Sequence, residues 1–275
     1  MAAGSGVSAA RLAEHQKRLL VRGLSALVLV IICLAALFAS GVSFLVLVLI
    51  SATLVLAEWL RIAADLTATR LLPVVAAVAA SLIAFHFNAT EFAAGFAVAA
   101  MAAVVVVTWP GSRRVFWGWL GLAYVIVPAL ALLALHQDSP PLILWLFVIV
   151  WSTDIGAYLV GSAAGGPKLW PRVSPAKTWS GAVGGGILGC VAGTAIAFGV
   201  FDSPREIIPM LLAGLAVSIS GQVGDLAESA WKRHFVVKDS GAMIPGHGGV
   251  MDRLDSLVPA VILVAIVEPV WSLGI

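Results

Sequence analysis

Residues 23–57 read GLSALVLVIICLAALFASGVSFLVLVLISATLVLA, a stretch of 35 residues without one charged side chain. A helix that crosses a membrane needs roughly 20 mostly apolar residues to pass through about 30 Å of hydrocarbon. The stretch is therefore long enough for two short spans. The adjacent small residues Ser40 and Gly41 lie near its middle, and a break there predicts spans over 23–39 and 42–57.

The rest of the chain has the same apolar character. Of its 275 residues 61% are hydrophobic and 11% are charged, which excludes an ordinary soluble domain. The net charge of +2 gives no support for a nucleic-acid partner. Further apolar runs predict seven more spans, over 71–87, 92–109, 116–135, 141–160, 180–201, 206–223 and 257–273. The expected fold is an all-α, polytopic integral membrane helical bundle of about nine transmembrane helices.

The Lys and Arg residues predict the orientation of these spans, because cytoplasmic loops of membrane proteins are enriched in both. With a cytoplasmic N-terminus, 15 of the 16 basic residues fall on the cytoplasmic side and Arg205 alone falls outside. Fusing the first two spans would put the alternation out of phase. We therefore expect an N-terminal membrane region of five spans (1–140) and a C-terminal membrane region of four spans (141–275), whose polar loops at 161–179 and 224–256 face the cytoplasm. For a bacterial source this means the inner (plasma) membrane.

The segment 225–255 concentrates charge, with nine of the chain's thirty charged residues. Solvation of a cytoplasmic loop is one explanation, but the spacing favours a site. If the eighth span continues as a helix, Asp225, Glu228, Ser229 and Lys232 share one face, since they are spaced i, i+3, i+4 and i+7.

A glycine-rich turn follows and leads to two further carboxylates. The turn contains Gly241, Pro245, Gly246, His247, Gly248 and Gly249. Such a loop lets backbone N–H groups approach an anion closely. The chain then returns to the membrane at Asp252 and Asp255. Carboxylate oxygens suit a hard ion such as Mg²⁺, so Asp225 and Asp252 are the predicted metal ligands, with Lys232, Arg233 and Lys238 for phosphate oxygens.

A second polar region begins inside an apolar span. Asp154 would cost at least about 2.5 kcal/mol there if it were charged and unpaired, so it should face a polar cavity or a partner. A protonated helix-packing residue is the alternative. The loop after this span presents Ser174, Lys177 and Thr178, which could bind a triphosphate or a lipid headgroup, although cations that only mark topology would look the same.

The seventh span carries a face of small residues, because glycine recurs at 181, 185, 189 and 193. Such a face permits close packing of helices. Its partner is either a helix of the same chain or the same helix of a second chain, so a homodimer stays open.

Together these residues resemble the defining motif of the phosphatidate cytidylyltransferases, the CDP-diacylglycerol synthases. The matching segments are Ser229-x-x-Lys232-Arg233, Lys238-Asp239-Ser240-Gly241 and Pro245-Gly246-His247-Gly248-Gly249-x-x-Asp252-Arg253-x-Asp255-Ser256. Segments around Asp154, Ser174–Gly181 and Gly224–Ser229 are also similar, so the likeness covers roughly residues 150–256. Residues 1–140 match the family only in hydropathy and number of spans. Ala176 is a small departure from the pattern.

The resemblance implies an enzyme that condenses CTP with phosphatidic acid, with Mg²⁺, to give CDP-diacylglycerol and pyrophosphate. Asp225 and Asp252 match the metal positions. The expected catalytic residues are Lys232, Arg233, Lys238, Asp239, His247 and Asp255. The expected substrate-binding residues are Asp154, Ser174, Lys177, Thr178, Ser229, Gly246, Gly248, Gly249 and Arg253. Whether His247 is a hydrogen-bond donor or a base is open, and Asp239 and Asp255 either orient neighbouring cations or hold a second metal ion.

Two other functions remain at this point. A CTP-dependent lipid kinase would use a similar nucleotide site but would need a base to activate an alcohol. A transporter is suggested by Asp154 and by Glu268 inside spans, but the clustering of acids and bases on one side argues against a through-path.

Overall fold

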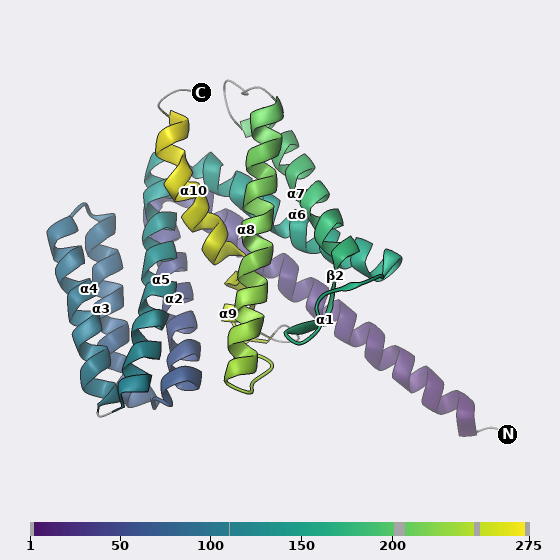
Figure 1. The fold of residues 1–275 in the computed structure, drawn as a ribbon, viewed down its shortest axis with the longest axis horizontal. Coiled ribbons are helices and arrows are strands. Elements are labelled where there is room, and N and C mark those ends of the chain that lie inside the picture. The colour runs from purple at the N-terminus through teal and green to yellow at the C-terminus, as the bar shows by residue number, and fades with distance from the viewer. Residues whose placement is uncertain (1–2, 110, 201–206, 245–247, 273–275) are drawn as a thin grey trace.

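The computed structural model describes residues 3–109, 111–200, 207–244 and 248–272, and of 3–19, 22, 200 and 269–272 only the backbone. The described chain is a helical bundle (Figure 1) with one short hairpin, which confirms the all-α prediction. The elements are α1 (Ala3–Ala39), α2 (Gly41–Ala64), α3 (Ala68–His86), α4 (Thr90–Thr108), α5 (Ser112–Asp138), α6 (Pro140–Ala164), β1 (Lys168–Trp170), β2 (Ser174–Thr178), α7 (Trp179–Val200), α8 (Ile207–His234), α9 (Met251–Leu254) and α10 (Leu257–Ser272).

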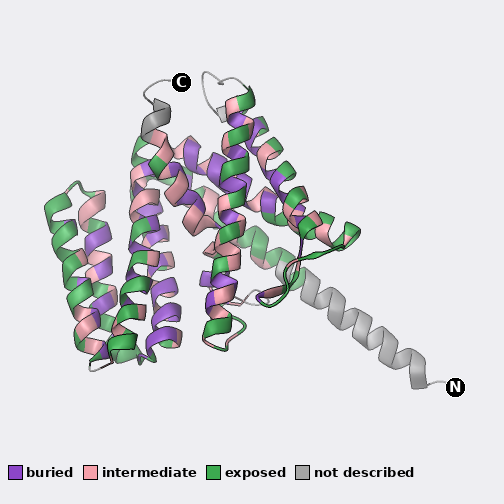
Figure 2. Cartoon of the chain, in the orientation of Figure 1, coloured by how far each residue is buried: buried purple, intermediate pink, exposed green. Residues whose placement is uncertain are grey.

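The helices have the lengths and surfaces of membrane spans. Within the described residues, seven helices (α2 to α8) are long and apolar enough to cross a bilayer, and Gly23–Ala39 and Leu257–Glu268 are shorter apolar segments. Large apolar residues such as Phe92, Val106 and Ile208 are exposed. Figure 2 shows exposed residues along the described helices. Contiguous exposed apolar surface of this kind fits lipid rather than water. The number of crossings and the side of the N-terminus stay predictions.

The break predicted at Ser40 is present. Ser40 has an extended backbone, with φ −170° and ψ 161°, and its hydroxyl accepts a hydrogen bond from the N–H of Ser43 at 3.1 Å. A serine in this position satisfies a backbone donor at the start of a helix. The uncharged stretch 23–57 therefore forms the end of α1 and most of α2.

Contacts between distant segments sort the helix ends into two groups. At one end Arg114 pairs with Asp65 at 3.8 Å and Arg113 contacts His234 at 3.4 Å, which brings the α2–α3 and α4–α5 connections beside the end of α8. At the other end the Nε2 atom of Gln137 donates to the carbonyl of His86 at 3.1 Å. The basic loops after α2 and α4 thus lie at the same end as the charged end of α8.

An aromatic cluster fixes α2, α5 and α8 together at this end. The rings of Trp59 and Trp231 stack with centroids 4.4 Å apart, and Trp59 and Tyr124 stack at 5.0 Å. The Trp59 indole N–H donates to the carbonyl of Trp117 at 2.8 Å. Stacked rings and a satisfied indole make this a rigid point in the bundle.

The glycine face of α7 packs against α6 of the same chain. A Cβ at Gly185 would lie 2.7 Å from the Thr153 carbonyl oxygen and 3.0 Å from the Ala157 Cβ. Gly181 likewise lies beside the backbone of Ala157 and Gly161. The same-chain partner is therefore the one observed for this face, as small residues in membrane helices allow.

Gly185→Ala is expected to lower the midpoint temperature of unfolding in detergent, because the added methyl group separates α6 from α7. Gly199→Ala is the matched control on the same helix, since a Cβ there meets no atom of the described residues within 4 Å and alanine is the better helix former. Circular dichroism during heating measures both. Equal effects of the two substitutions would contradict the packing described for α7.

The sequence predicts an irregular loop between α6 and α7, but the structure has a β-hairpin there. Strands β1 and β2 pair antiparallel, with Lys168 opposite Thr178 and Trp170 opposite Ser174. Ser174 precedes Pro175, and the residue before a proline is restricted to extended conformations. That local restriction supplies a strand where hydropathy indicates only a loop.

Candidate active site

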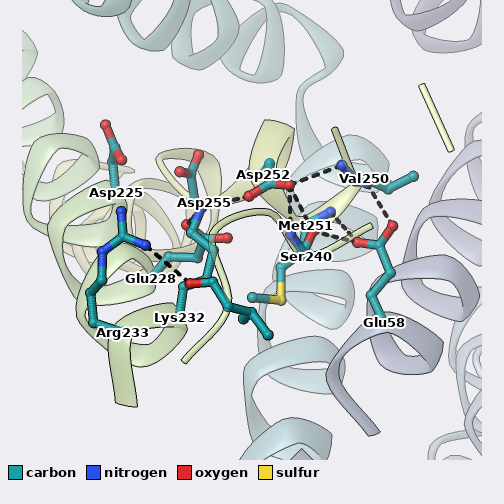
Figure 3. Close-up of polar contacts among 12 residues, drawn as sticks. Glu58, Asp225, Glu228, Lys232, Arg233, Ser240, Val250, Met251, Asp252 and Asp255 are labelled. Atoms are coloured by element: carbon teal, nitrogen blue, oxygen red, sulfur yellow. Dashed lines mark hydrogen bonds and ion pairs between the residues drawn. The ribbon is translucent and has the colours of Figure 1, made fainter. Parts of the chain in front are cut away.

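The charged stripe of α8 is formed as its spacing predicts. The helix runs without interruption to His234 and carries Glu228 and Lys232 one turn apart. The Lys232 ammonium lies 2.5 Å from the buried Glu228 carboxylate and 2.5 Å from the Oδ1 atom of Asp252 (Figure 3). Lys232 therefore joins α8 to the start of the last membrane segment, and its position is fixed by two carboxylates.

Asp252 lies on the short helix α9 and receives hydrogen bonds on both oxygens. Its Oδ2 atom accepts from the backbone N–H groups of Ser240 and Gly249, each at 2.9 Å, and lies within hydrogen-bond distance of the Ser240 hydroxyl, also at 2.9 Å. Burial opposes the charged form, but the Lys232 ammonium and the two N–H groups outweigh it and hold the pKa of Asp252 below its usual value. Asp252 is therefore a carboxylate at neutral pH.

Asp225 forms its contact with the hairpin. Its carboxylate pairs with the ammonium of Lys177, which strand β2 delivers to the side of α8. The next residue, Thr178, accepts a hydrogen bond from the N–H of Gly181 at 3.1 Å and so caps the first turn of α7. The hairpin thus brings Lys177, a predicted substrate-binding residue, into contact with Asp225, a predicted metal ligand.

Asp255 belongs to a cluster of acidic side chains that includes Asp225 and Glu228. Burial raises its pKa well above the usual value, and the carboxylates of Asp225 and Glu228 raise it further, against one hydrogen bond from the N–H of Ser256. Carboxylates that repel each other in this way are stabilised by a bound cation.

Asp255→Asn is expected to raise the midpoint temperature of unfolding by at least about 2 °C in a chelating buffer at pH 7. The sign follows from the raised pKa, because ionised Asp255 opposes folding above the pKa of the unfolded chain, and that penalty fades as the pH falls. The gain over wild type should therefore shrink on acidification. Differential scanning fluorimetry at several pH values measures this, and a lower midpoint at pH 7 would contradict it.

The predicted residues from four parts of the chain meet around a polar cavity of about 730 Å³. It lies between α6, the hairpin, α7, α8 and the start of the last segment. The predicted site residues that line it are Asp154, Lys177, Thr178, Asp225, Lys232, Asp239, Asp252, Arg253 and Asp255. Asp154 thus faces a polar cavity, as its place in an apolar span required.

Other predicted residues do not line this cavity. Arg233 instead donates to the carbonyls of Val173 at 3.3 Å and Val237 at 3.0 Å, and so ties α8 to the hairpin. Gly249 contributes through its N–H to Asp252. Ser174, Ser229, Lys238 and Gly248 are described but lie outside the lining, and Gly246 and His247 lie outside the described residues.

The structure adds residues that the sequence interpretation missed. Lys168, Gln222 and Ser256 line the cavity, and none of the three is among the predicted site residues. Ser240 lies in a quoted motif without an assigned role. Glu58, directly after the apolar stretch 23–57, accepts hydrogen bonds from the glycine-rich segment. A charged residue directly after a 35-residue uncharged stretch is the signal that the sequence offers for it.

The charge of the cavity bears on a metal ion. Five carboxyl groups and four cations line it among the described residues, so ionised carboxylates offset much of the positive charge that the cations offer to a polyphosphate. Within the described chain no three His, Cys, Asp or Glu side chains are grouped to hold a metal by themselves. Mg²⁺ characteristically takes one or two carboxylates together with phosphate oxygens. The donor chemistry therefore fits Mg²⁺ bound jointly with a phosphate ligand.

A separate apolar cavity of about 130 Å³ shares lining residues with the polar one. It lies among α2, α5, α6 and α10 and is lined by side chains such as Phe44, Leu132 and Val261. Asp154 and Arg253 belong to the linings of both cavities. A ligand with a charged head and an apolar body could therefore contact both.

Comparisons with known proteins show which family the chain resembles. Residues 20–270 match the Cytidylyltransferase family. The chain is similar to the phosphatidate cytidylyltransferase of Brucella suis biovar 1 (strain 1330), with 46% identity over 181 residues, which is 65% of this chain and 66% of the relative. It is also similar to the phosphatidate cytidylyltransferases of Staphylococcus haemolyticus (strain JCSC1435), 45% identical over 50% of this chain and 53% of the relative, and of Bacillus subtilis (strain 168), 48% identical over 45% and 46%. These matches thus span about half to two thirds of the relatives' length. Because the family match covers most of the sequence, the chain belongs to the Cytidylyltransferase family.

Proposed function

We propose that the protein transfers the cytidylyl group of CTP to phosphatidate, giving CDP-diacylglycerol and pyrophosphate. The observation that carries this proposal is the pair of cavities, one polar and one apolar, which share Asp154 and Arg253. The nucleotide would bind in the polar cavity, and the phospholipid would contact both the polar and the apolar cavity. The names of the relatives support the choice of CTP and phosphatidate.

The chemistry needs positioning more than it needs a base. The second pKa of a phosphate monoester is about 6, so phosphatidate is largely a dianion at neutral pH and already a nucleophile. One of its oxygens forms a bond to the α-phosphorus of CTP, and the bond from that phosphorus to the bridging oxygen breaks. Pyrophosphate leaves with that electron pair. The site must therefore align two anions and offset their charge.

The cations of the cavity are placed for this task. Lys232 is held between Glu228 and Asp252, so its ammonium is oriented before substrate binds. Lys177 comes from the hairpin, and Arg253 lines both the polar and the apolar cavity. We assign Lys177 and Lys232 to the triphosphate and Arg253 to the lipid phosphate.

The activity we propose is Mg²⁺-dependent. Asp225 and Asp252 would hold the ion, which when bound would add positive charge to that of the lysine and arginine side chains in the lining. In the described structure Asp252 already accepts hydrogen bonds on both oxygens. Lys232 would therefore release Oδ1 and keep its contact with Glu228, or turn toward phosphate.

We further place the polar cavity on the cytoplasmic face of a bacterial inner membrane. The support is the grouping of the basic α2–α3 and α4–α5 connections at the same end as the charged end of α8. CTP is a cytosolic nucleotide and would reach the site from that side. A homodimer stays an open proposal.

Release of pyrophosphate tests the function directly. The purified protein is incubated in detergent with Mg²⁺ and with CTP, phosphatidate or both, and pyrophosphate is measured with a coupled enzyme. We expect release only when both substrates are present. Release from CTP alone would indicate hydrolysis, and release that phosphatidate does not stimulate would contradict the proposal.

A further inference from the structure

We propose that Glu58 is a positioning residue of the active site. From helix α2, in the part of the chain that carries no predicted site residue, its carboxylate holds the two described parts of the glycine-rich segment, 240–244 and 248–251, in the conformation that presents Asp252 to the polar cavity. This inference rests on the proposed function for its kinetic consequence, while its structural consequence can be measured separately.

Three hydrogen bonds join Glu58 to both ends of this segment (Figure 3). Its Oε2 atom accepts from the Ser240 hydroxyl at 2.8 Å and from the N–H of Met251 at 2.9 Å. Its Oε1 atom accepts from the N–H of Val250 at 2.9 Å. The side chain is 4% exposed. A buried carboxylate that is satisfied by three donors from a distant segment fixes that segment tightly.

The glycines of the segment allow this approach. A Cβ at Gly241 would lie 2.6 Å from the Oε1 atom of Glu58, and one at Gly249 would lie 2.6 Å from Oε2. Both distances are too short for a real Cβ, so a side chain at either position would push the segment away from α2. These two glycines are therefore needed for contact with Glu58, in addition to any contact with a substrate.

The same segment connects Glu58 to Asp252. Consecutive backbone N–H groups divide between the two carboxylates, with Gly249 donating to Asp252 and Val250 and Met251 donating to Glu58. The Ser240 hydroxyl lies within hydrogen-bond distance of both, at 2.8 Å from Glu58 and 2.9 Å from Asp252. It has one proton and so donates to one of them at a time. A change at Glu58 must therefore alter the donors around Asp252.

Glu58 acts through this segment and does not line the polar cavity. Its neighbour Trp59 stacks on Trp231 of α8, so the helix that carries Glu58 is itself held against the helix that carries Lys232. Helix α2 is thus a fixed support that positions the turn before Asp252 relative to α8.

Glu58→Gln tests the proposal in the full-length protein. The amide keeps the volume of the side chain but places an NH₂ group against N–H and O–H donors. We expect kcat for CDP-diacylglycerol formation to fall by about 100-fold, as misplacement of a catalytic group by about 1 Å can cause. Hydrogen–deuterium exchange at the amides of 249–251 should also become faster. In a Ser240→Ala background the additional loss of activity should be smaller, because the two residues share one contact.

Ser81→Ala is the matched control. Ser81 is also buried, and its hydroxyl donates to the carbonyl of Ala93 at 2.8 Å between α3 and α4. Loss of this bond should lower thermal stability and leave kcat and exchange at 249–251 unchanged.

Two results would overturn the proposal. One is wild-type exchange at 249–251 in Glu58→Gln. The other is faster exchange with wild-type kcat. If the wild-type protein itself forms no CDP-diacylglycerol, the proposed function fails, and unchanged exchange would show separately that Glu58 does not hold the segment.

Discussion

Asp252→Asn is expected to reduce turnover at least about 100-fold while leaving the protein folded in detergent. In the wild type, one oxygen of Asp252 accepts from Lys232 and the other from Ser240 and Gly249. An asparagine presents an NH₂ group on one of these two sides, where it meets another donor. Either Lys232 or the glycine-rich turn then loses its partner, and the site loses a predicted Mg²⁺ ligand.

Steady-state assays of CDP-diacylglycerol formation measure the effect, with circular dichroism to verify folding. Asp138→Asn is the matched control, because Asp138 is exposed at the end of α5 that lies away from the polar cavity. It should retain wild-type turnover. Activity above about a tenth of wild type in Asp252→Asn would reject the role assigned to this carboxylate.

Asp225→Asn is expected to have a comparably large effect for a different reason. Its carboxylate faces the polar cavity and pairs with Lys177, so its loss removes a proposed metal ligand and frees a cation. Turnover should fall at least about 100-fold at a Mg²⁺ concentration that saturates the wild type. The variant should also need more Mg²⁺ for half of its residual activity. Chelation of Mg²⁺ should stop the wild-type reaction and excess Mg²⁺ should restore it.

A titration of activity against Mg²⁺ checks this prediction. Glu91→Gln is a suitable control, since Glu91 is an exposed carboxylate in the first turn of α4 and does not line the cavity. Its Mg²⁺ dependence should match that of the wild type. An unchanged Mg²⁺ requirement in Asp225→Asn would show that this residue acts only through Lys177.

Local periodicity accounts for the parts of the site that could be predicted from sequence. Glu228 and Lys232 are one helical turn apart, so their pairing requires only that α8 continues past the apolar run, and it does. Arg233 follows Lys232 directly and is therefore turned about 100° around the helix. It contacts the backbone of Val173 and Val237 rather than the cavity.

The parts that could not be predicted depend on contacts between distant segments. Glu58 and Ser240 are 182 residues apart, and no local pattern reports that their side chains meet. Hydropathy ends the second predicted span at residue 57, one residue before Glu58, whose carboxylate contacts the glycine-rich segment. The hairpin that brings Lys177 to Asp225 was also missed, because the sequence there indicates only a polar loop.

Transfer of label from CTP tests the central claim most directly. The purified protein is incubated with phosphatidate, Mg²⁺ and CTP labelled at either the α- or the γ-phosphorus, and the lipid is extracted and counted. We predict label in the lipid from α-labelled CTP and in released pyrophosphate from γ-labelled CTP. Label in the lipid from γ-labelled CTP alone would show phosphoryl transfer by a lipid kinase and would contradict the cytidylyltransferase account.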